Sequence, residues 1–170
     1  MLNRLVKTNE DYALTIARLV LGMLFFIHGD QLMLGWFGGY GLSGSMQFFT
    51  RDLGIPAPFA FLAICAEFFG GLMLIVGFLG RLAALTIICT MAVAIAKVHW
   101  QFGVFMNWFG TQKGEGFEYH LLAITLGVIV ALRGSGALSL DRLLARLRGS
   151  VPMDRDRLGT GAHAVTSRSL

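Results

Sequence analysis

Residues 59–100 read FAFLAICAEFFGGLMLIVGFLGRLAALTIICTMAVAIAKVHW. An α-helix needs about 20 predominantly apolar residues to cross a bilayer, and the stretches 59–79 and 82–100 each come close to that length. Only Gly80 and Arg81 separate them, which leaves room for nothing longer than a tight turn. The sequence therefore predicts two membrane-spanning helices joined as an antiparallel hairpin.

Two further apolar stretches, 12–34 and 117–132, lie on either side of this hairpin. The first is too long for the 7–15-residue apolar region of a signal peptide, and no small-x-small cleavage site follows it, so we expect it to be retained. The last is the shortest and needs a few flanking residues to span the membrane. We predict an all-α integral membrane protein, a four-helix up-down bundle over residues 12–134.

The composition agrees with a membrane protein. Of the 170 residues, 55% are hydrophobic and 14% are charged, whereas soluble domains have about 25% charged residues. The net charge of +4 is small and most basic residues lie near the chain ends, which argues against a nucleic-acid partner. Cys65 and Cys89 stand alone in apolar runs without a CxxC pair, so we expect small core residues rather than a disulfide or a redox thiol pair.

The positions of Lys and Arg predict the orientation. Ten of them fall in the N-terminal segment, the 80–81 turn and the region after the last span, whereas the other side has only Arg51 and Lys113. Because cytoplasmic loops carry the excess of positive charge, residues 1–11 and the C-terminus are predicted to be cytoplasmic, with loops 35–58 and 101–116 outside.

The region after the last span divides into two parts. Residues 135–148 are predicted to include a short amphipathic helix that Ser139 caps, with arginines among its other positions. Its apolar face consists of Leu140, Leu143, Leu144 and Leu147. This pattern is typical of a basic helix lying on anionic membrane lipid, and the alternative is a protein-docking helix. Residues 149–170 are polar and are predicted to be disordered.

Small residues predict where the helices approach one another. Gly70, Gly71 and Gly77 lie in or at the end of the second span, and Gly127 lies in the fourth. Glycine allows close backbone approach between membrane helices, so we expect helix contacts at these positions.

Each predicted span carries an ionisable side chain, which costs about 2.5–3.5 kcal/mol near the bilayer centre. Four of these residues fall in the outer half, one per helix: His28, Glu67, His99 and Glu118. We expect them to face inward as one cluster. Lys97 and His120 lie two positions from His99 and Glu118, about 200° away around the helix, and are expected to be structural or interfacial. Arg18 lies deep in the cytoplasmic half, where we expect it to anchor a carbonyl group or a partner helix.

Four interpretations of this cluster stay open. The first is a structural network that locks the bundle, and the second is a proton-coupled site for a quinone. The third is a metal site, and the fourth is part of a pathway for a small solute. Histidine and a buried carboxylate suit proton exchange with a quinone. The ligand types suit iron, manganese or zinc, but the Glu-x-x-His spacing of di-iron bundles is missing. The support for a solute pathway is weak, because Arg18 is the only polar residue that could line it in the cytoplasmic half of the predicted spans.

Aromatic and glycine residues are concentrated in the two outer loops. Trp36 lies in the run Gly35–Gly41, and four aromatic residues lie in loop 101–116. They form either the usual aromatic belt at the membrane interface or a lid over an aromatic ligand, in which Trp36 would contact the ligand.

Several fragments, in their order and spacing, resemble the DoxX family of small four-helix membrane proteins, over roughly residues 12–141. The fragments are His28-Gly29, Gly35-Trp36-Phe37-Gly38-Gly39, Glu67-Phe68-Phe69-Gly70-Gly71, Gly77, Arg81, Met91-Ala92-Val93-Ala94-Ile95, His99, Glu118-Tyr119 and Gly134-Ser135-Gly136-Ala137-Leu138-Ser139-Leu140-Asp141. The resemblance implies a multi-pass protein of the bacterial inner membrane and a membrane oxidoreductase subunit. Leu32 stands where such proteins often have Lys, so the resemblance assigns no anionic substrate.

From these observations we expect a subunit of a quinone-linked redox system. His28 and His99 would be proton donors or ligands, and Glu67 and Glu118 would be the carboxylates that tune them. A soluble or membrane redox protein is the expected partner, and self-association stays open. The alternatives are a non-catalytic membrane anchor or assembly partner for a soluble redox enzyme and, third, a small-solute carrier.

Overall fold

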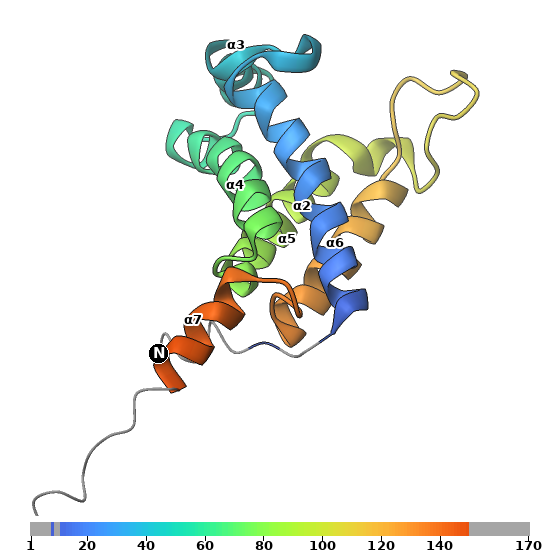
Figure 1. Cartoon of the computed structure of the whole chain (residues 1–170). Helices are drawn as coiled ribbons and strands as arrows, with labels where there is room; N and C mark the ends of the chain where they lie inside the picture. Colours follow the sequence, from blue (N-terminus) through green and yellow to red (C-terminus); the bar gives the residue numbers. More distant parts are fainter. Residues whose placement is uncertain (1–7, 9–10, 150–170) are drawn as a thin grey trace, which may run out of the picture.

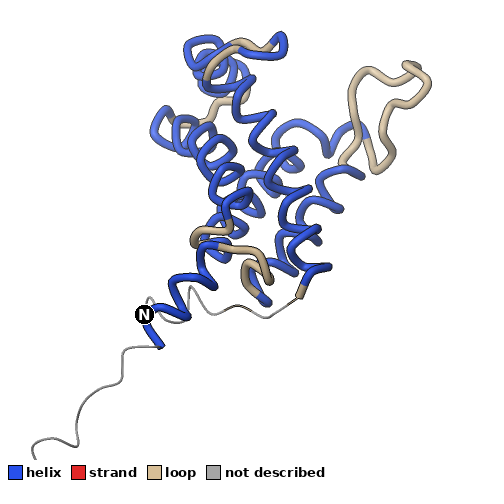
Figure 2. Tube along the Cα trace, viewed as in Figure 1, coloured by secondary structure: helices blue, strands red, loops and turns tan. Residues whose placement is uncertain are grey.

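The computed structural model describes residue 8 and residues 11–149, and these residues contain helices and loops but no strand (Figure 2). The all-α prediction is therefore confirmed for this part of the chain. The predicted disordered tail, from residue 150 onward, and most of the predicted cytoplasmic segment 1–11 lie outside the described residues.

The long helices run between two ends of the molecule, with α3 at one end and α7 at the other (Figure 1). We refer to these as the α3 end and the α7 end. The elements in chain order are α2 (Tyr12–Met33), η1 (Trp36–Gly38), α3 (Gly41–Gln47), η2 (Phe48–Asp52), α4 (Ala57–Val76), α5 (Gly80–Ala94), η3 (Ile95–His99), η4 (Trp100–Phe102), α6 (Glu118–Arg133) and α7 (Leu140–Gly149).

Three helical segments are long and apolar enough to cross a membrane: Tyr12–Met33, Ala57–Val76 and Gly80–Phe102. They coincide with the first three predicted spans, and the third continues through η3 and η4. The fourth predicted span also forms a helix, α6, but its 16 residues fall short of the length that crosses a bilayer unaided. The fourth span at α6 and the cytoplasmic location of the termini stay predictions.

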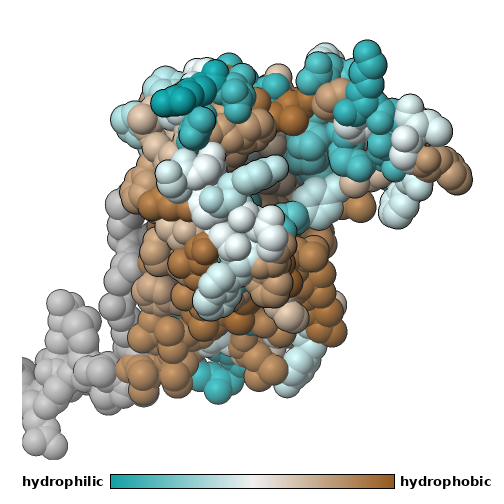
Figure 3. Space-filling model, turned by 90° about the horizontal axis from the view of Figure 1, so that it is seen from above, coloured by the Kyte–Doolittle hydropathy of each residue, from teal (hydrophilic) through white to brown (hydrophobic). Residues whose placement is uncertain are grey.

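Hydrophobic side chains cover much of the face seen from the α3 end, and hydrophilic residues gather toward one edge of that view (Figure 3). The exposed hydrophobic residues include Val20 and Ile27 on α2, Leu62 on α4 and Leu122 on α6. Exposed apolar side chains on long helices are the expected surface of a protein that lies in lipid.

Helices α2 and α4 pack against each other through glycine. A methyl group on Gly71 would lie 2.8 Å from the Cα of Phe26, and one on Gly22 would lie 2.9 Å from the backbone nitrogen of Ile75. No larger residue fits these positions without moving backbone. The predicted contact at Gly71 is confirmed, and Gly22 on α2 is its counterpart.

Arg18 is buried at the α7 end and holds three segments together. Its Nη1 donates hydrogen bonds to the carbonyl oxygens of Leu74 and Ile75, the latter at 2.8 Å, and its Nη2 donates to the carbonyl oxygen of Leu138 at 2.7 Å. These carbonyls include ones that the last turn of α4 leaves without helical partners. The expectation that Arg18 anchors carbonyl groups is confirmed.

Asp141, the first acidic residue of α7, is buried beside the turn between α4 and α5. Its carboxylate accepts hydrogen bonds from the backbone nitrogens of Leu79, at 2.8 Å, and Gly80, at 3.1 Å, and from the Ser135 hydroxyl at 2.6 Å. Leu79 itself provides no side-chain cap for α5. Asp141 therefore caps α5 from a distant part of the chain.

The segment 135–148 divides into a loop and a helix. Gly134 and Gly136 have φ angles of 94° and 82°, which are incompatible with a helix, so α7 begins at Leu140. Ser139 accepts a hydrogen bond from the backbone nitrogen of Arg142 at 3.3 Å, as its predicted capping role requires. Three leucines of the predicted apolar face are exposed: Leu140, Leu143 and Leu147. The side chain of Arg148 lies outside the described residues.

Candidate functional site

A cavity of about 820 Å³ lies toward the α3 end and is open on one side. Helices α2, α4, α5 and α6 contribute to its wall, together with η2, η3 and the loop before α6. Its volume lies within the range of about 300–1,000 Å³ that is typical of small-molecule sites. The wall is mainly apolar.

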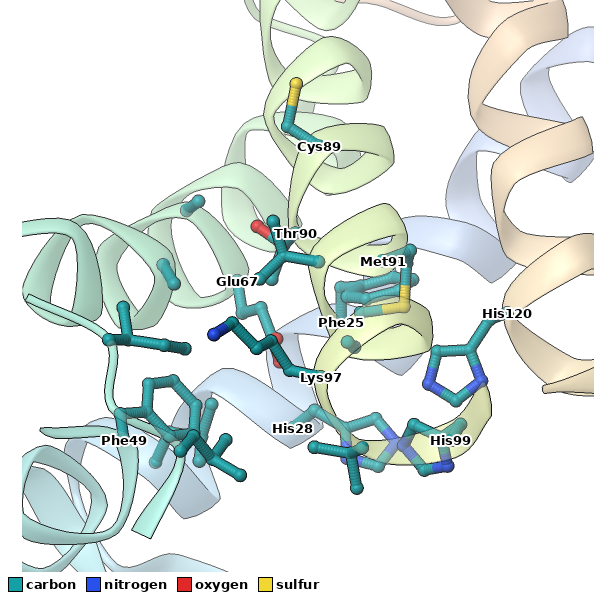
Figure 4. Close-up of a pocket in the computed structure, with 18 of the residues that line it drawn as sticks. Phe25, His28, Phe49, Glu67, Cys89, Thr90, Met91, Lys97, His99 and His120 are labelled. Atoms are coloured by element: carbon teal, nitrogen blue, oxygen red, sulfur yellow. The ribbon is translucent and has the colours of Figure 1, made fainter. Parts of the chain in front are cut away.

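Six of the polar residues that line this cavity come from four elements, and Figure 4 labels five of them. They are His28 on α2, Glu67 on α4, Lys97 and His99 on η3, and Tyr119 and His120 on α6. We call these six residues the polar cluster. An apolar pocket with a few convergent polar groups is the usual form of a ligand site.

The glycine contacts between α2 and α4 place the first two of these residues. A methyl group on Gly29 would overlap the backbone of Phe68 and lie 2.8 Å from the carbonyl carbon of Glu67. The two helix backbones therefore touch where Gly29 meets Glu67 and Phe68. His28 precedes Gly29 in the chain, so this contact brings His28 and Glu67 to the wall of one cavity.

The imidazoles of His99 and His120 lie side by side, with ring centroids 4.0 Å apart. The Nδ1–H of His99 donates a hydrogen bond to the carbonyl oxygen of Glu115 at 2.8 Å, because a carbonyl oxygen can only accept. In the neutral ring, Nε2 of His99 is then left as an acceptor.

Tyr119 and His28 continue the aromatic wall, with ring centroids 6.2 Å apart. The Tyr119 hydroxyl and Nδ1 of His120 are buried and have no hydrogen-bond partner in the part of the chain that the structure describes. Glu67 is also buried, and among the described residues we find no hydrogen bond or ion pair to its carboxylate. Buried polar groups are nearly always hydrogen-bonded. These groups are therefore suited to bind polar atoms of a ligand.

Glu118, which we expected beside the other three residues, does not line the cavity. Its Oε2 accepts a hydrogen bond from the backbone nitrogen of Met106 at 3.4 Å, and its own backbone nitrogen donates to the carbonyl oxygen of Val104 at 2.8 Å. Glu118 is the first residue of α6 and ties the preceding loop to the helix. The prediction that it faces inward with His28, Glu67 and His99 is wrong.

His120 occupies the place expected for Glu118, and the sequence contains a signal for it. Gly127 was already predicted to face a neighbouring helix, and His120 lies seven residues before it, within about 20° of the same helix face. Glu118 lies nine residues before Gly127, which is about 180° away. The buried residues of α6 are His120, Ala123, Gly127 and Val130, in agreement with this register.

Lys97 also lines the cavity, although we expected only His99 of this pair to do so. Both residues lie in the π-helical turn η3, which widens the helix where α5 ends. Such π turns are frequent at functional sites. Trp36 is exposed on η1 and does not line the cavity, so no contact with a ligand follows from its position.

Neither cysteine is in a disulfide, and neither is a fully buried core residue. Cys65 is half-buried, whereas Cys89 is exposed and lines the cavity.

Within residues 11–149 no group of three or more His, Cys, Asp or Glu side chains is arranged to hold a metal ion.

Comparison with known proteins places the chain among bacterial membrane proteins. The DoxX family model matches residues 13–100. Inner membrane protein YqjF of Escherichia coli (strain K12) is 31% identical over 140 residues, which cover 82% of this chain and 97% of that protein. A protein of Bacillus subtilis (strain 168) named "Putative oxidoreductase CatD" is 28% identical over 126 residues, 74% of this chain and 82% of its own length. No solved structure matches the chain.

Proposed function

The chain belongs to the DoxX family, and we propose that it is a subunit of a quinone-linked oxidoreductase system in the bacterial inner membrane. The observation that carries this proposal is the polar cluster in an otherwise apolar cavity. The name of the Bacillus relative, a putative oxidoreductase, supports a redox role, and the name of the Escherichia coli relative supports the location.

The polar cluster suits the chemical needs of a quinone head group. A bound quinone would supply the redox chemistry, with two electrons and two protons exchanged in full reduction. The Tyr119 hydroxyl, the imidazoles of His28 and His120 and the Lys97 ammonium group can donate to carbonyl oxygens. Glu67 and His99 offer groups that exchange protons, and histidine does so near neutral pH. The aromatic wall suits a flat ring.

The orientation we propose has four spans, with α6 as the fourth and both termini in the cytoplasm. Its support is the excess of Lys and Arg at the α7 end and in the chain ends. The polar cluster would then lie in the outer leaflet, close enough to the outer surface for proton exchange with water.

A second candidate is a membrane anchor for a soluble redox enzyme. The observation that favours it is α7, which has exposed leucines on one face and several arginines. Such a helix binds either anionic lipid or an apolar groove on a partner. The contacts of Arg18 and Asp141 fix where α7 leaves the membrane domain, as an anchor requires.

The experiment that tests the redox proposal measures the ligand content of protein purified from native membranes without chelator. One preparation is divided for solvent extraction with mass spectrometry and for elemental analysis, which also tests the metal alternative. Glu67→Gln is compared with Glu118→Gln, a matched change at a carboxylate outside the cavity. We expect stoichiometric quinone in the wild type and in Glu118→Gln, and its loss in Glu67→Gln.

Quinone-dependent turnover in the same membranes gives the second measurement. Glu67→Gln should abolish it while the bundle stays folded. Full turnover in folded Glu67→Gln protein would contradict the redox proposal. The anchor is tested separately with Leu143→Gln/Leu147→Gln, which should release a bound partner from membranes while Glu67→Gln retains it.

A further inference from the structure

Part of the open boundary of the cavity lies between α4 and α5. Leu62 on α4 and Leu85, Cys89 and Val93 on α5 line the cavity, and all four are also exposed at the surface of the molecule. The three α5 residues are spaced by four and share one helix face. The cavity therefore continues into a crevice that reaches the surface between these two helices, and we call these four residues the crevice residues.

The crevice is closed toward the α7 end and opens toward the α3 end. At Gly70 the two helices touch, because a methyl group there would lie 3.2 Å from Oγ1 of Thr86 and 3.5 Å from Cδ1 of Ile87. Glu67, Thr90 and Lys97 line the cavity beyond this contact (Figure 4). At the α3 end, Phe49 of η2 covers the cavity.

The two threonines beside the crevice offer no free hydroxyl donor to a polar ligand. The hydroxyl of Thr86 donates to the carbonyl oxygen of Ala83 at 2.8 Å, and that of Thr90 donates to the carbonyl oxygen of Thr86 at 3.0 Å. Both threonines thus present methyl groups to the cavity. From Leu85 to His99 the cavity follows α5 over about 21 Å, with polar groups gathered near its α3 end.

We infer that the ligand enters sideways from the bilayer between α4 and α5, and that it has an apolar chain that lies against the crevice residues. This rests on the proposed function, which places a polar ring at the polar cluster. The exposed α4 and α5 surfaces lie in the region that the long apolar helices place in lipid. A ring with an attached chain matches both the polar cluster and the apolar crevice, and the chain would point from the ring toward the bilayer centre.

The test narrows the crevice and compares two ligands. The probes are a 1,4-benzoquinone with a ten-carbon chain and the same ring without the chain, with binding measured in lipid nanodiscs against ligand concentration in the lipid phase. Val93→Trp fills the crevice. Its control is Val76→Trp, since Val76 is 48% exposed and Val93 47%, and Val76 does not line the cavity. Leu62→Trp and Leu122→Trp, at 61% and 64% exposure, form the second pair.

We expect Val93→Trp and Leu62→Trp to weaken binding of the chain-bearing quinone at least tenfold, with binding of the bare ring changed less than twofold. Neither control should weaken either ligand. Equal binding of the chain-bearing ligand by all four variants would overturn the inference and leave the proposed function standing, with bilayer lipid as the occupant of the crevice. Equal weakening of both ligands would also overturn it, because the ring would then occupy the crevice. Failure of the wild type to bind either ligand would overturn both proposals.

Discussion

Replacing Asp141 with alanine should destabilise the protein strongly, although Asp141 lies far from the cavity. Its carboxylate accepts three hydrogen bonds, of 2.6, 2.8 and 3.1 Å. Two come from the turn between α4 and α5, and one comes from the loop between α6 and α7. A hydrogen bond to a charged group contributes about 1.5–3 kcal/mol, but three bonds that share one carboxylate do not add fully. Removing one member of a buried charged network costs about 3–5 kcal/mol, and we expect Asp141→Ala to fall in that range.

The assay is equilibrium unfolding in mixed micelles, with the free energy of unfolding measured for matched variants. Asp141→Asn keeps one acceptor oxygen, so its loss of unfolding free energy should be about half that of Asp141→Ala. Asp52→Ala changes an exposed aspartate on η2 and should stay within about 0.5 kcal/mol of the wild type. Arg18→Met/Asp141→Ala should lose less than the sum of the single variants, because the Asp141 carboxylate attracts the Arg18 guanidinium and the double variant removes both charges. If Asp141→Ala unfolds at the same free energy as Asp52→Ala, the capping role is refuted.

Three further predictions concern packing and the site. Gly71→Ala should cost several kcal/mol in unfolding free energy because it meets the backbone of α2, whereas Gly127→Ala should cost much less because it meets the movable side chain of Ile88; similar losses would contradict this packing. His120→Phe should weaken quinone binding about two- to tenfold, the value of one hydrogen bond, and Glu118→Gln should leave it unchanged; the reverse result would restore Glu118 to the site. In single-cysteine protein, N-ethylmaleimide should modify Cys89 without denaturant and bound quinone should slow the reaction, which mass spectrometry of the adduct measures; unchanged labelling would show that ligand does not cover Cys89.

The spans could be predicted because they depend on local composition. A run of about 20 apolar residues has few stable conformations other than a membrane-spanning helix, so three helices form where the hydropathy predicts them. Arg18 could be predicted for a related reason: a buried guanidinium must have acceptors, and the carbonyls at a helix end are the nearest unbonded ones.

The α5 cap could not be predicted in this way. Asp141 and Gly80 are separated by 61 residues, and nothing in the local pattern around either one indicates the other. Asp141 belongs to one of the sequence fragments that resemble the DoxX family, but that resemblance does not indicate that its side chain caps α5. Contacts of this kind depend on how the elements pack, which a sequence pattern does not contain.

The misplacement of Glu118 has a different cause. Depth along the helix does not distinguish Glu118 from His120, because the two residues lie at nearly the same level. Helix register decides between them, and Gly127 supplied that register from within the same helix. In the structure His120 and Tyr119 line the cavity with His28, Glu67 and His99, and Glu118 does not.

Buried polar groups that lack a hydrogen-bond partner among the described residues occur both beside the cavity and away from it. The Tyr119 hydroxyl and Nδ1 of His120 belong to residues that line the cavity, whereas Nε of Arg18, Oδ1 of Asp30 and Oγ of Ser45 belong to residues that do not. An unbonded buried group costs about 1–3 kcal/mol. A ligand in the cavity can offer partners to the first two groups and not to the other three. Access from the cavity, rather than the lack of a partner alone, is therefore what supports the proposed site.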